Sequence, residues 1–344
     1  MITYNPIYAL LIFVALSLLL YFIFKPKTGW YWIVRKNNKN QDKIVVEDIL
    51  KHMFHTESDG DVTNENSLIE NLSLQKDTLK NSLQTMQNNG LIVNENSELS
   101  LSNSGRDYAL RIIRIHRLWE KYLAEKTGFD KKEWHQRAER KEHELNVEET
   151  NLLSAKLGEP KFDPHGDPIP STTGKMATLN GVSLIKLPVY AKGRIVHIED
   201  EPALIYKQIL AEDIHIGSYI KVLENNEKRV VFYSEGEEFK LAPEVANNLT
   251  IEIENEANEL EENYVRLSSL KLNETAKITG LSKECRGDNR RRLLDLGFVK
   301  GADISIALEN PLSNPTAYLI KGTSIALRKS QAVQILIIKE ITNE

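Results

Sequence analysis

The residues best suited to chemistry lie in the segment His135–His143, which combines imidazole and carboxylate side chains. On a helix with about 100° per residue and His135 at 0°, Glu139 falls at about 40°, Glu142 at about −20° and His143 at about 80°. The four side chains therefore share one stripe. Nitrogen and oxygen donors without a thiolate suit Mn²⁺, Fe²⁺ or Zn²⁺. This spacing favours a metal site, although an acidic helix face with two histidines is also typical of solvated surface.

A second pair of donors lies on the preceding predicted helix, residues 105–127. His116 and Glu120 are four residues apart, so they share one face of that helix. The turn at residues 127–130 allows this face to meet the stripe on the next helix. A metal ion held by such donors could activate water, but the sequence shows no pocket-forming scaffold around them. We therefore expect a metal site in a protein that is not an enzyme.

Composition bounds the class of protein. The chain has 344 residues, which predicts two or three domains, and 41% of them are hydrophobic, which is enough for sizeable cores. The formal net charge of −5 gives no global signature of nucleic-acid binding. Cys285 is the only cysteine, so a disulfide framework is excluded and a reducing compartment is indicated.

The N-terminal segment predicts a membrane anchor. Residues 7–24 form an uncharged run of about 18 residues, the lower end of what crosses a bilayer. Lysines and arginines follow it, with aromatic residues at 30–32, which places the remainder of the chain on the cytoplasmic side. We expect residues 1–30 to be a single-pass anchor in the inner (cytoplasmic) membrane. A buried core helix is the alternative.

The remaining pattern predicts a mainly α N-terminal half and two small all-β barrels. Three short helices, at residues 44–54, 67–72 and 74–88, precede a hairpin, which is typical of a winged helix-turn-helix over residues 31–105. Residues 105–157 are almost wholly helical, and residues 158–174 form an irregular connector.

Two strand-rich modules look like an internal repeat. Residues 213–222 and 297–306 are similar at an offset of 84, and each segment continues into short alternating strands. SH3-like barrels fit these lengths. We assign them to residues 173–253 and 269–344, joined by an acidic linker at 254–268.

Three segments carry a resemblance to a known family: HRLWE at His116–Glu120, the stripe at His135–His143, and DPHGDPIP at Asp163–Pro170. In this order they resemble the diphtheria-toxin-repressor and manganese-transport-regulator family of metal-dependent bacterial repressors, over about residues 44–253. Residues 270–338 resemble the FeoA-type SH3-like domain associated with ferrous iron uptake. The resemblance implies a homodimer, with residues 106–172 as the metal-binding and dimerisation domain.

The resemblance also implies two metal sites. The primary site would use Asp48, Glu139, Glu142 and His143, and the ancillary site would use His116, Glu120 and His135. Iron-selective members carry cysteine where Glu139 stands, so the resemblance favours Mn²⁺, with Fe²⁺ close behind and Zn²⁺ possible. Two departures are visible. Lys51 replaces a carboxylate that some members use for a second ion. Glu199 and Glu201 lie near the place of ligands supplied by the first barrel, but Pro202 disturbs that pattern.

Finally, the resemblance implies binding to palindromic operator DNA, with residues 76–87 as the recognition helix. The residues expected to meet DNA are Gln75, Lys76, Lys80, Asn81 and Gln84. Residues 43–105 contain 4 basic and 10 acidic side chains, however, a net charge of −6 that opposes contact with phosphates. The predicted anchor at residues 7–24, together with residues 25–30, also resembles the last transmembrane segment of metal ABC-transporter permeases that carry a fused repressor-like tail. The alternative is therefore a membrane-anchored metal-sensing subunit that regulates a transporter by protein contact, without binding DNA.

Overall fold

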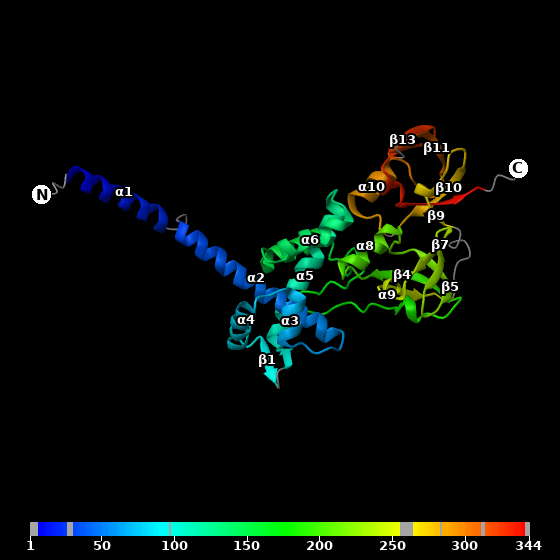
Figure 1. The fold of residues 1–344 in the computed structure, drawn as a ribbon. Coiled ribbons are helices and arrows are strands. Elements are labelled where there is room, and N and C mark those ends of the chain that lie inside the picture. Colours follow the sequence, from blue (N-terminus) through cyan, green and yellow to red (C-terminus); the bar gives the residue numbers. More distant parts are fainter. Residues whose placement is uncertain are drawn as a thin grey trace. The chain divides into compact units, whose positions relative to one another are not determined.

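The computed structural model describes residues 6–25, 30–95, 98–254, 264–282, 284–310 and 314–340, with backbone alone at residues 6–9, 12 and 30–40. Figure 1 shows the elements along the chain. The chain divides into two compact units. The first unit comprises residues 1–114 and 142–145, and the second comprises residues 115–141 and 146–344.

The first unit contains the predicted succession of helices and a hairpin. Its elements are α1 (Pro6–Phe24), α2 (Trp30–Ser58), α3 (Glu65–Leu72), α4 (Lys76–Asn88), β1 (Ile92–Glu95), β2 (Glu98–Leu101) and the start of α5 (Asn103–Lys126). The predicted helix at 44–54 is the second half of the longer α2. Asn64 caps the N-terminus of α3 in a capping box. The Asn64 side chain accepts from the backbone N–H of Ser67, and the Ser67 hydroxyl accepts from the backbone N–H of Asn64.

The core of the first unit explains this arrangement. Apolar side chains from α2, α3, α4, the hairpin and α5 are buried together, and they include Ile49, Leu68, Leu83, Ile92 and Ile113. The hairpin pairs Ile92 with Leu101 in an antiparallel register. The helix periodicity of the apolar residues therefore predicts this part of the fold correctly.

The predicted membrane anchor is not supported. A span needs about 20 consecutive apolar residues, because each residue of a helix advances only about 1.5 Å through a core of about 30 Å. Among the helices that the structure describes, none combines the length and the apolarity that crossing a membrane requires. The prediction of an anchor at residues 1–30, and with it the localisation in the cytoplasmic membrane, is therefore wrong.

The second unit begins with the remainder of α5, followed by α6 (Lys131–Glu142) and α7 (Val147–Lys156). These three helices confirm the helical character predicted for residues 105–157. Asn146 caps the N-terminus of α7 in a second capping box, in which the Glu149 side chain accepts from the backbone N–H of Asn146. No helix interrupts residues 158–174, where the chain forms turns and a single bridge between Phe162 and Pro168.

Two six-stranded antiparallel sheets follow, with short helices between their strands. The first β domain contains β3 (Val182–Ser183), β4 (Lys192–Ile198), α8 (Ala203–Ala211), β5 (Tyr219–Asn225), β6 (Val230–Ser234), β7 (Glu237–Leu241), α9 (Pro243–Asn247) and β8 (Leu249–Ile253). The second β domain contains β9 (Val265–Arg266), β10 (Thr275–Leu281), α10 (Gly287–Asp295), β11 (Asp303–Glu309), β12 (Thr316–Ile320), β13 (Thr323–Leu327), α11 (Lys329–Ala332) and β14 (Ile335–Lys339). Most of the predicted acidic linker, residues 255–263, lies outside the described residues.

The two β domains are copies of one topology. The strand order is β3-β8-β4-β5-β6-β7 in the first and β9-β14-β10-β11-β12-β13 in the second, so each strand has a counterpart. The ladders are also irregular at equivalent places, after Ile195 in β4 and after Ile278 in β10. These shared features confirm the internal repeat.

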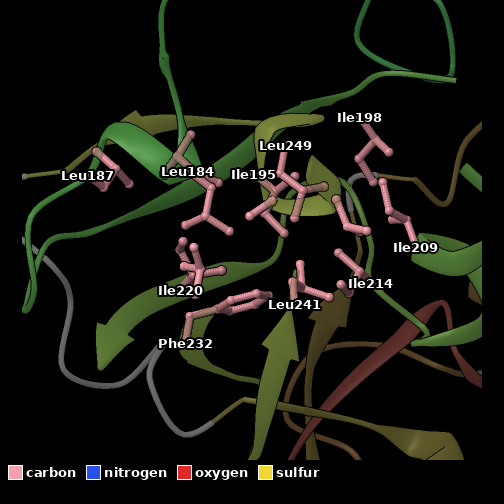
Figure 2. Close-up of a cluster of buried hydrophobic side chains, with 14 of the residues drawn as sticks. Leu184, Leu187, Ile195, Ile198, Ile209, Ile214, Ile220, Phe232, Leu241 and Leu249 are labelled. Carbon is pink, nitrogen blue, oxygen red and sulfur yellow. The ribbon is translucent and has the colours of Figure 1, made fainter. Parts of the chain in front are cut away.

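Figure 2 shows the core of the first β domain, where the labelled side chains point toward one another. Phe232 on β6, Ile220 on β5 and Ile195 on β4 are all at most 1% exposed. Each of these three side chains belongs to the buried core of this domain, and successive side chains of a strand point to opposite faces. This core fixes the loop after β4, which carries residues of the candidate site.

Candidate metal centre

A cluster of metal-competent side chains lies in the first unit and consists of Asp48, Glu142 and His143; we refer to it as the first cluster. Asp48 is on α2, Glu142 is the last residue of α6, and His143 follows it. His143 Nε2 lies 3.4 Å from Asp48 Oδ1 and 3.7 Å from Glu142 Oε1. One donor atom from each residue lies within 4.8 Å of the others. A single cation could therefore contact all three residues.

Two further residues orient the imidazole of His143. Its Nδ1 lies 2.7 Å from Oε2 of Glu47, and Tyr108 Oη donates to the other oxygen of Glu47 at 2.7 Å. Burial alone would lower the pKa of His143, but hydrogen bonds to Asp48 and Glu47 outweigh it and raise this pKa to about 9. The buried Glu47 leaves Nε2 facing the cluster, which is the usual role of a carboxylate behind a metal-bound histidine. Glu47 is not among the site residues predicted from the sequence.

The Lys51 side chain forms an ion pair with a carboxylate of the first cluster. Its Nζ donates to Glu142 Oε1 at 2.9 Å, and the Glu142 side chain is fully buried. Burying a carboxylate is costly unless it is paired, so this contact stabilises Glu142 when no metal is bound. Lys51 therefore lies against the first cluster as a positive charge paired with one of its carboxylates.

The second cluster lies in the second unit and is centred on the buried Glu120, with His116, His135, His165 and Asp200 around it. Glu120 Oε1 lies 3.1 Å from His116 Nε2, 3.5 Å from His135 Nδ1 and 3.9 Å from His165 Nε2. Burial would raise the pKa of Glu120, but the charge of His116 and of the neighbouring histidines outweighs this effect and holds the pKa well below its usual value. The arrangement puts one carboxylate within reach of three imidazoles.

His165 and Asp200 are not among the ligands predicted from the sequence, although His165 lies in the motif at residues 163–170 and Asp200 lies between Glu199 and Glu201. Asp200 Oδ2 lies 3.0 Å from His135 Nδ1 and 3.8 Å from His165 Nε2. The other nitrogen of His165, Nδ1, lies 3.2 Å from Tyr206 Oη, so Nε2 is the one that faces the cluster. Asp200 follows β4 and reaches His135 only because the fold brings the first β domain to α6.

The motif at residues 116–120 contacts the motif at residues 163–170. Arg117 donates to Asp167 Oδ1 at 2.9 Å and to the backbone carbonyl of Pro168 at 2.7 Å. Gly166 has φ +94°, and a Cβ there would lie 2.2 Å from the carbonyl oxygen of Val196. Only glycine allows this close approach. The motif at residues 163–170 is thereby held against β4, and His165 is carried to the second cluster.

The donors fit a divalent cation. Three buried atoms of the second cluster, Glu120 Oε1, His135 Nδ1 and His165 Nε2, have no hydrogen-bond partner of acceptable geometry among the described residues. Buried polar atoms normally have partners, so atoms that converge without them indicate a place for an ion. Imidazole and carboxylate donors without sulfur suit Mn²⁺, Fe²⁺ or Zn²⁺. The first cluster offers donors of the same kinds.

Three of the four residues predicted for the primary site, Asp48, Glu142 and His143, lie together in the first unit. The fourth, Glu139, belongs to the second unit, where its Oε1 lies 3.5 Å from His135 Nε2. Glu201 also reaches His135 Nε2, at 3.5 Å. Glu199 instead accepts from the backbone N–H of Glu201, and burial is the main cause that raises its pKa to about 7.

The residues expected to meet DNA share one exposed surface. The apolar residues Leu79, Leu83 and Met86 of α4 are buried in the core of the first unit. The opposite side of α4 and the residue before it expose polar side chains, namely Gln75, Lys76, Lys80, Asn81 and Gln84. This placement is what a recognition helix requires.

Comparison with family models identifies two segments of the chain. Residues 102–171 match the iron dependent repressor, metal binding and dimerisation domain, which contains most residues of the second cluster. Residues 265–339 match the FeoA domain, which is the second β domain.

Individual relatives agree with these matches. The diphtheria toxin repressor of Corynebacterium glutamicum is 27% identical over 215 residues, which cover 59% of this chain and 93% of that protein. A solved manganese-dependent transcriptional repressor in complex with manganese is 25% identical, with a TM-score of 0.54, and covers 61% of this chain and 100% of its own. A probable metal transport system membrane protein of Chlamydia trachomatis is 41% identical over 86 residues, which cover 25% of this chain.

The match to the chlamydial protein spans only 19% of its length, so it supports neither a membrane nor a transporter partner for this chain. The repressor matches extend over almost the whole length of those relatives. Their family is one of transcriptional repressors and not of enzymes, as predicted. The chain thus matches the metal binding and dimerisation domain of the iron dependent repressors and a C-terminal FeoA domain, and it is similar to DtxR/IdeR-type repressors over about 59% of its length.

Proposed function

We propose that this protein is a dimeric transcriptional regulator of metal homeostasis that binds operator DNA in response to Mn²⁺ or Fe²⁺. One observation carries the proposal. In the first cluster, Asp48 on α2 lies beside Glu142 and His143 at the end of α6, within reach of one ion. Because α2 packs in the same core as α4, an ion held there restrains the helix that would enter the DNA major groove.

Each residue has a role in this proposal. A bound divalent ion would supply the positive charge that holds Asp48 and Glu142 together. His143 would donate through Nε2, because Glu47 and Tyr108 hold its ring by Nδ1. The hard oxygen donors of Asp48 and Glu142 are a ligand type that favours Mn²⁺ or Fe²⁺. The general order in which protein sites bind divalent metals favours Zn²⁺ instead. We assign Mn²⁺ or Fe²⁺, which agrees with the metal in the solved manganese-dependent repressor.

The charge of the winged helix favours a second candidate. Residues 43–105 carry a net charge of −6 from 4 basic and 10 acidic side chains, and phosphate contacts supply much of the affinity of DNA-binding proteins. A metal sensor that acts through protein contact, without DNA, would explain this charge. The exposed polar surface of α4 favours the repressor.

DNA retention separates the two candidates. The full chain is mixed with its own upstream DNA at low salt, with and without Mn²⁺, and compared with Lys80→Met and a scrambled DNA. The repressor requires Mn²⁺-dependent retention of the upstream DNA, weaker for the variant and falling with salt. Mn²⁺ binding without specific retention would favour the sensor that acts by protein contact.

Replacing Lys51 with methionine is expected to strengthen Mn²⁺ binding at the first cluster by about tenfold. The Lys51 ammonium pairs with Glu142 at 2.9 Å and must give up this carboxylate when an ion arrives. A hydrogen bond to a charged group contributes on the order of 1.5–3 kcal/mol, which is enough for this change. Calorimetric titration measures it, and Lys80→Met on exposed α4 is the control. Equal or weaker Mn²⁺ binding by Lys51→Met would show that Lys51 does not compete with the ion.

A further inference from the structure

Glu284 joins three parts of the second unit. It lies in the loop between β10 and α10 of the second β domain, and its side chain is 15% exposed. Glu284 Oε1 accepts from Lys131 Nζ at the start of α6 at 3.0 Å. Glu284 Oε2 lies 3.1 Å from His215 Nδ1 of the first β domain and 3.8 Å from Arg266 Nη1. One carboxylate of the FeoA domain therefore contacts both the metal-site helix and the other β domain.

The internal repeat gives this contact a counterpart. Glu284 follows Glu201 by 83 positions, the same offset that relates Ile195 in β4 to Ile278 in β10. In the first β domain the equivalent loop places Asp200 and Glu201 against His135. Both β domains thus use the same loop to place a carboxylate on α6.

The two contacts lie one helical turn apart. Lys131 and His135 are four residues apart on α6, so they share a face of the helix. The Lys131 contact with Glu284 therefore fixes the turn that immediately precedes the His135 ligand. Through His215, Glu284 also fixes the domain that supplies Asp200. Both sides of the His135–Asp200 contact are held by this one residue.

We propose that Glu284 is a positioning residue of the second cluster, through which the FeoA domain sets the affinity of that cluster for a divalent cation. Glu284 does not touch the ion. It holds α6 and the first β domain at the separation at which His135 and Asp200 can ligate together. The inference rests on the proposed metal binding by the second cluster.

Ion pairs and close packing around Glu284 restrain its position between α6 and the first β domain. Burial would raise its pKa, but Lys131, His215 and Arg266 outweigh this effect and hold the pKa well below its usual value. Arg266 is itself held by two bonds of 2.7 Å to Glu235 of the first β domain. Close by, Gly287 has φ +56°, and a Cβ there would lie 2.9 Å from the carbonyl oxygen of Glu125 on α5. The second β domain thus contacts both helices of the cluster.

The test uses the full chain in a His143→Ala background, so that only the second cluster binds Mn²⁺ with high affinity. Glu284→Gln is expected to weaken this binding by about tenfold, which lies within the range typical of coupling between separate sites. Co²⁺ bound in place of Mn²⁺ should show an altered visible spectrum. Asp288→Asn, which removes an exposed ion pair to Lys126 at 3.2 Å, is the matched control and should change neither readout.

A second variant protects the test against misfolding. Lys131→Met removes the other partner of the contact, and it is expected to weaken Mn²⁺ binding to a similar degree. Combining it with Glu284→Gln should add little, because both changes break one interaction.

Unchanged Mn²⁺ affinity and Co²⁺ spectrum in both single variants would overturn the positioning role. If Glu284→Gln also weakens the first cluster equally, tested in a Glu120→Gln background, the effect is global and the inference fails. If the parent His143→Ala protein binds no Mn²⁺, the proposed second site itself fails.

Discussion

Replacing His143 with alanine is expected to weaken Mn²⁺ binding at the first cluster by at least about 100-fold. His143 Nε2 faces Asp48 and Glu142, and it is the only imidazole of that cluster. Substitutions behind a metal ligand typically cost 10–100-fold in affinity, so loss of a ligand itself is expected to reach the upper end or exceed it. Calorimetric titration in a Glu120→Gln background measures the first cluster alone.

The fold should tolerate this substitution. Lys43 Nζ donates to the backbone carbonyl of His143, a contact that alanine preserves. His55→Ala, which removes an exposed histidine of α2, is the matched control and should bind Mn²⁺ as the parent does. If His143→Ala retained the parent affinity in this background, the first cluster would not be the metal site.

Replacing Glu120 with glutamine is expected to remove high-affinity Mn²⁺ binding from the second cluster, again by at least about 100-fold. Glu120 is buried and places one oxygen within 3.9 Å of three histidines. Glutamine keeps the shape but not the charge, so a dication would face the imidazoles with Asp200 as the remaining carboxylate of the cluster. Titration in the His143→Ala background isolates this site.

Glu133→Gln is the control for this second substitution, because Glu133 lies on α6 and is half exposed, with only a surface ion pair to Arg137. It should leave the affinity unchanged. The two substitutions, at His143 and at Glu120, must also be independent. A chain in which Glu120→Gln abolished binding at both clusters would contradict the assignment of two separate sites.

Much of the fold could be predicted because it depends on periodicity. The apolar spacing in α3 and α4, the turn at residues 89–90 and the alternating strands of the two β domains are local signals. The offset of 84 between similar segments predicts the repeat, and the structure shows equivalent strand orders and ladder irregularities. The anchor could not be judged in this way, because an apolar run at the lower limit of length is ambiguous.

The candidate site was predictable only in part, because ligands meet through tertiary structure. A helical stripe over residues 135–143 assumes one continuous helix, but α6 ends at Glu142. The direction of His143 therefore follows its contacts with Glu47 and Asp48, and not the helical period. Asp200 reaches His135 across the first β domain, and His165 through a turn that depends on Gly166. No spacing in the sequence encodes these contacts.

The same reasoning explains why the FeoA domain had no predicted role. Its local pattern identifies a small β domain, but only the structure shows Glu284 beside Lys131 and His215. A charged residue in a loop between a strand and a helix is usually solvated surface. The burial of Glu284 beside Lys131, His215 and Arg266 is the observation that suggests its function.

The measurement that most directly tests the central claim is the affinity of the full chain for Mn²⁺ with and without its upstream DNA. If metal and DNA binding are coupled, each must strengthen the other by the same factor, typically about 5–150-fold. We predict Mn²⁺ binding at least about fivefold tighter with the upstream DNA than with a scrambled sequence. The same Mn²⁺ affinity with both DNAs would contradict the account.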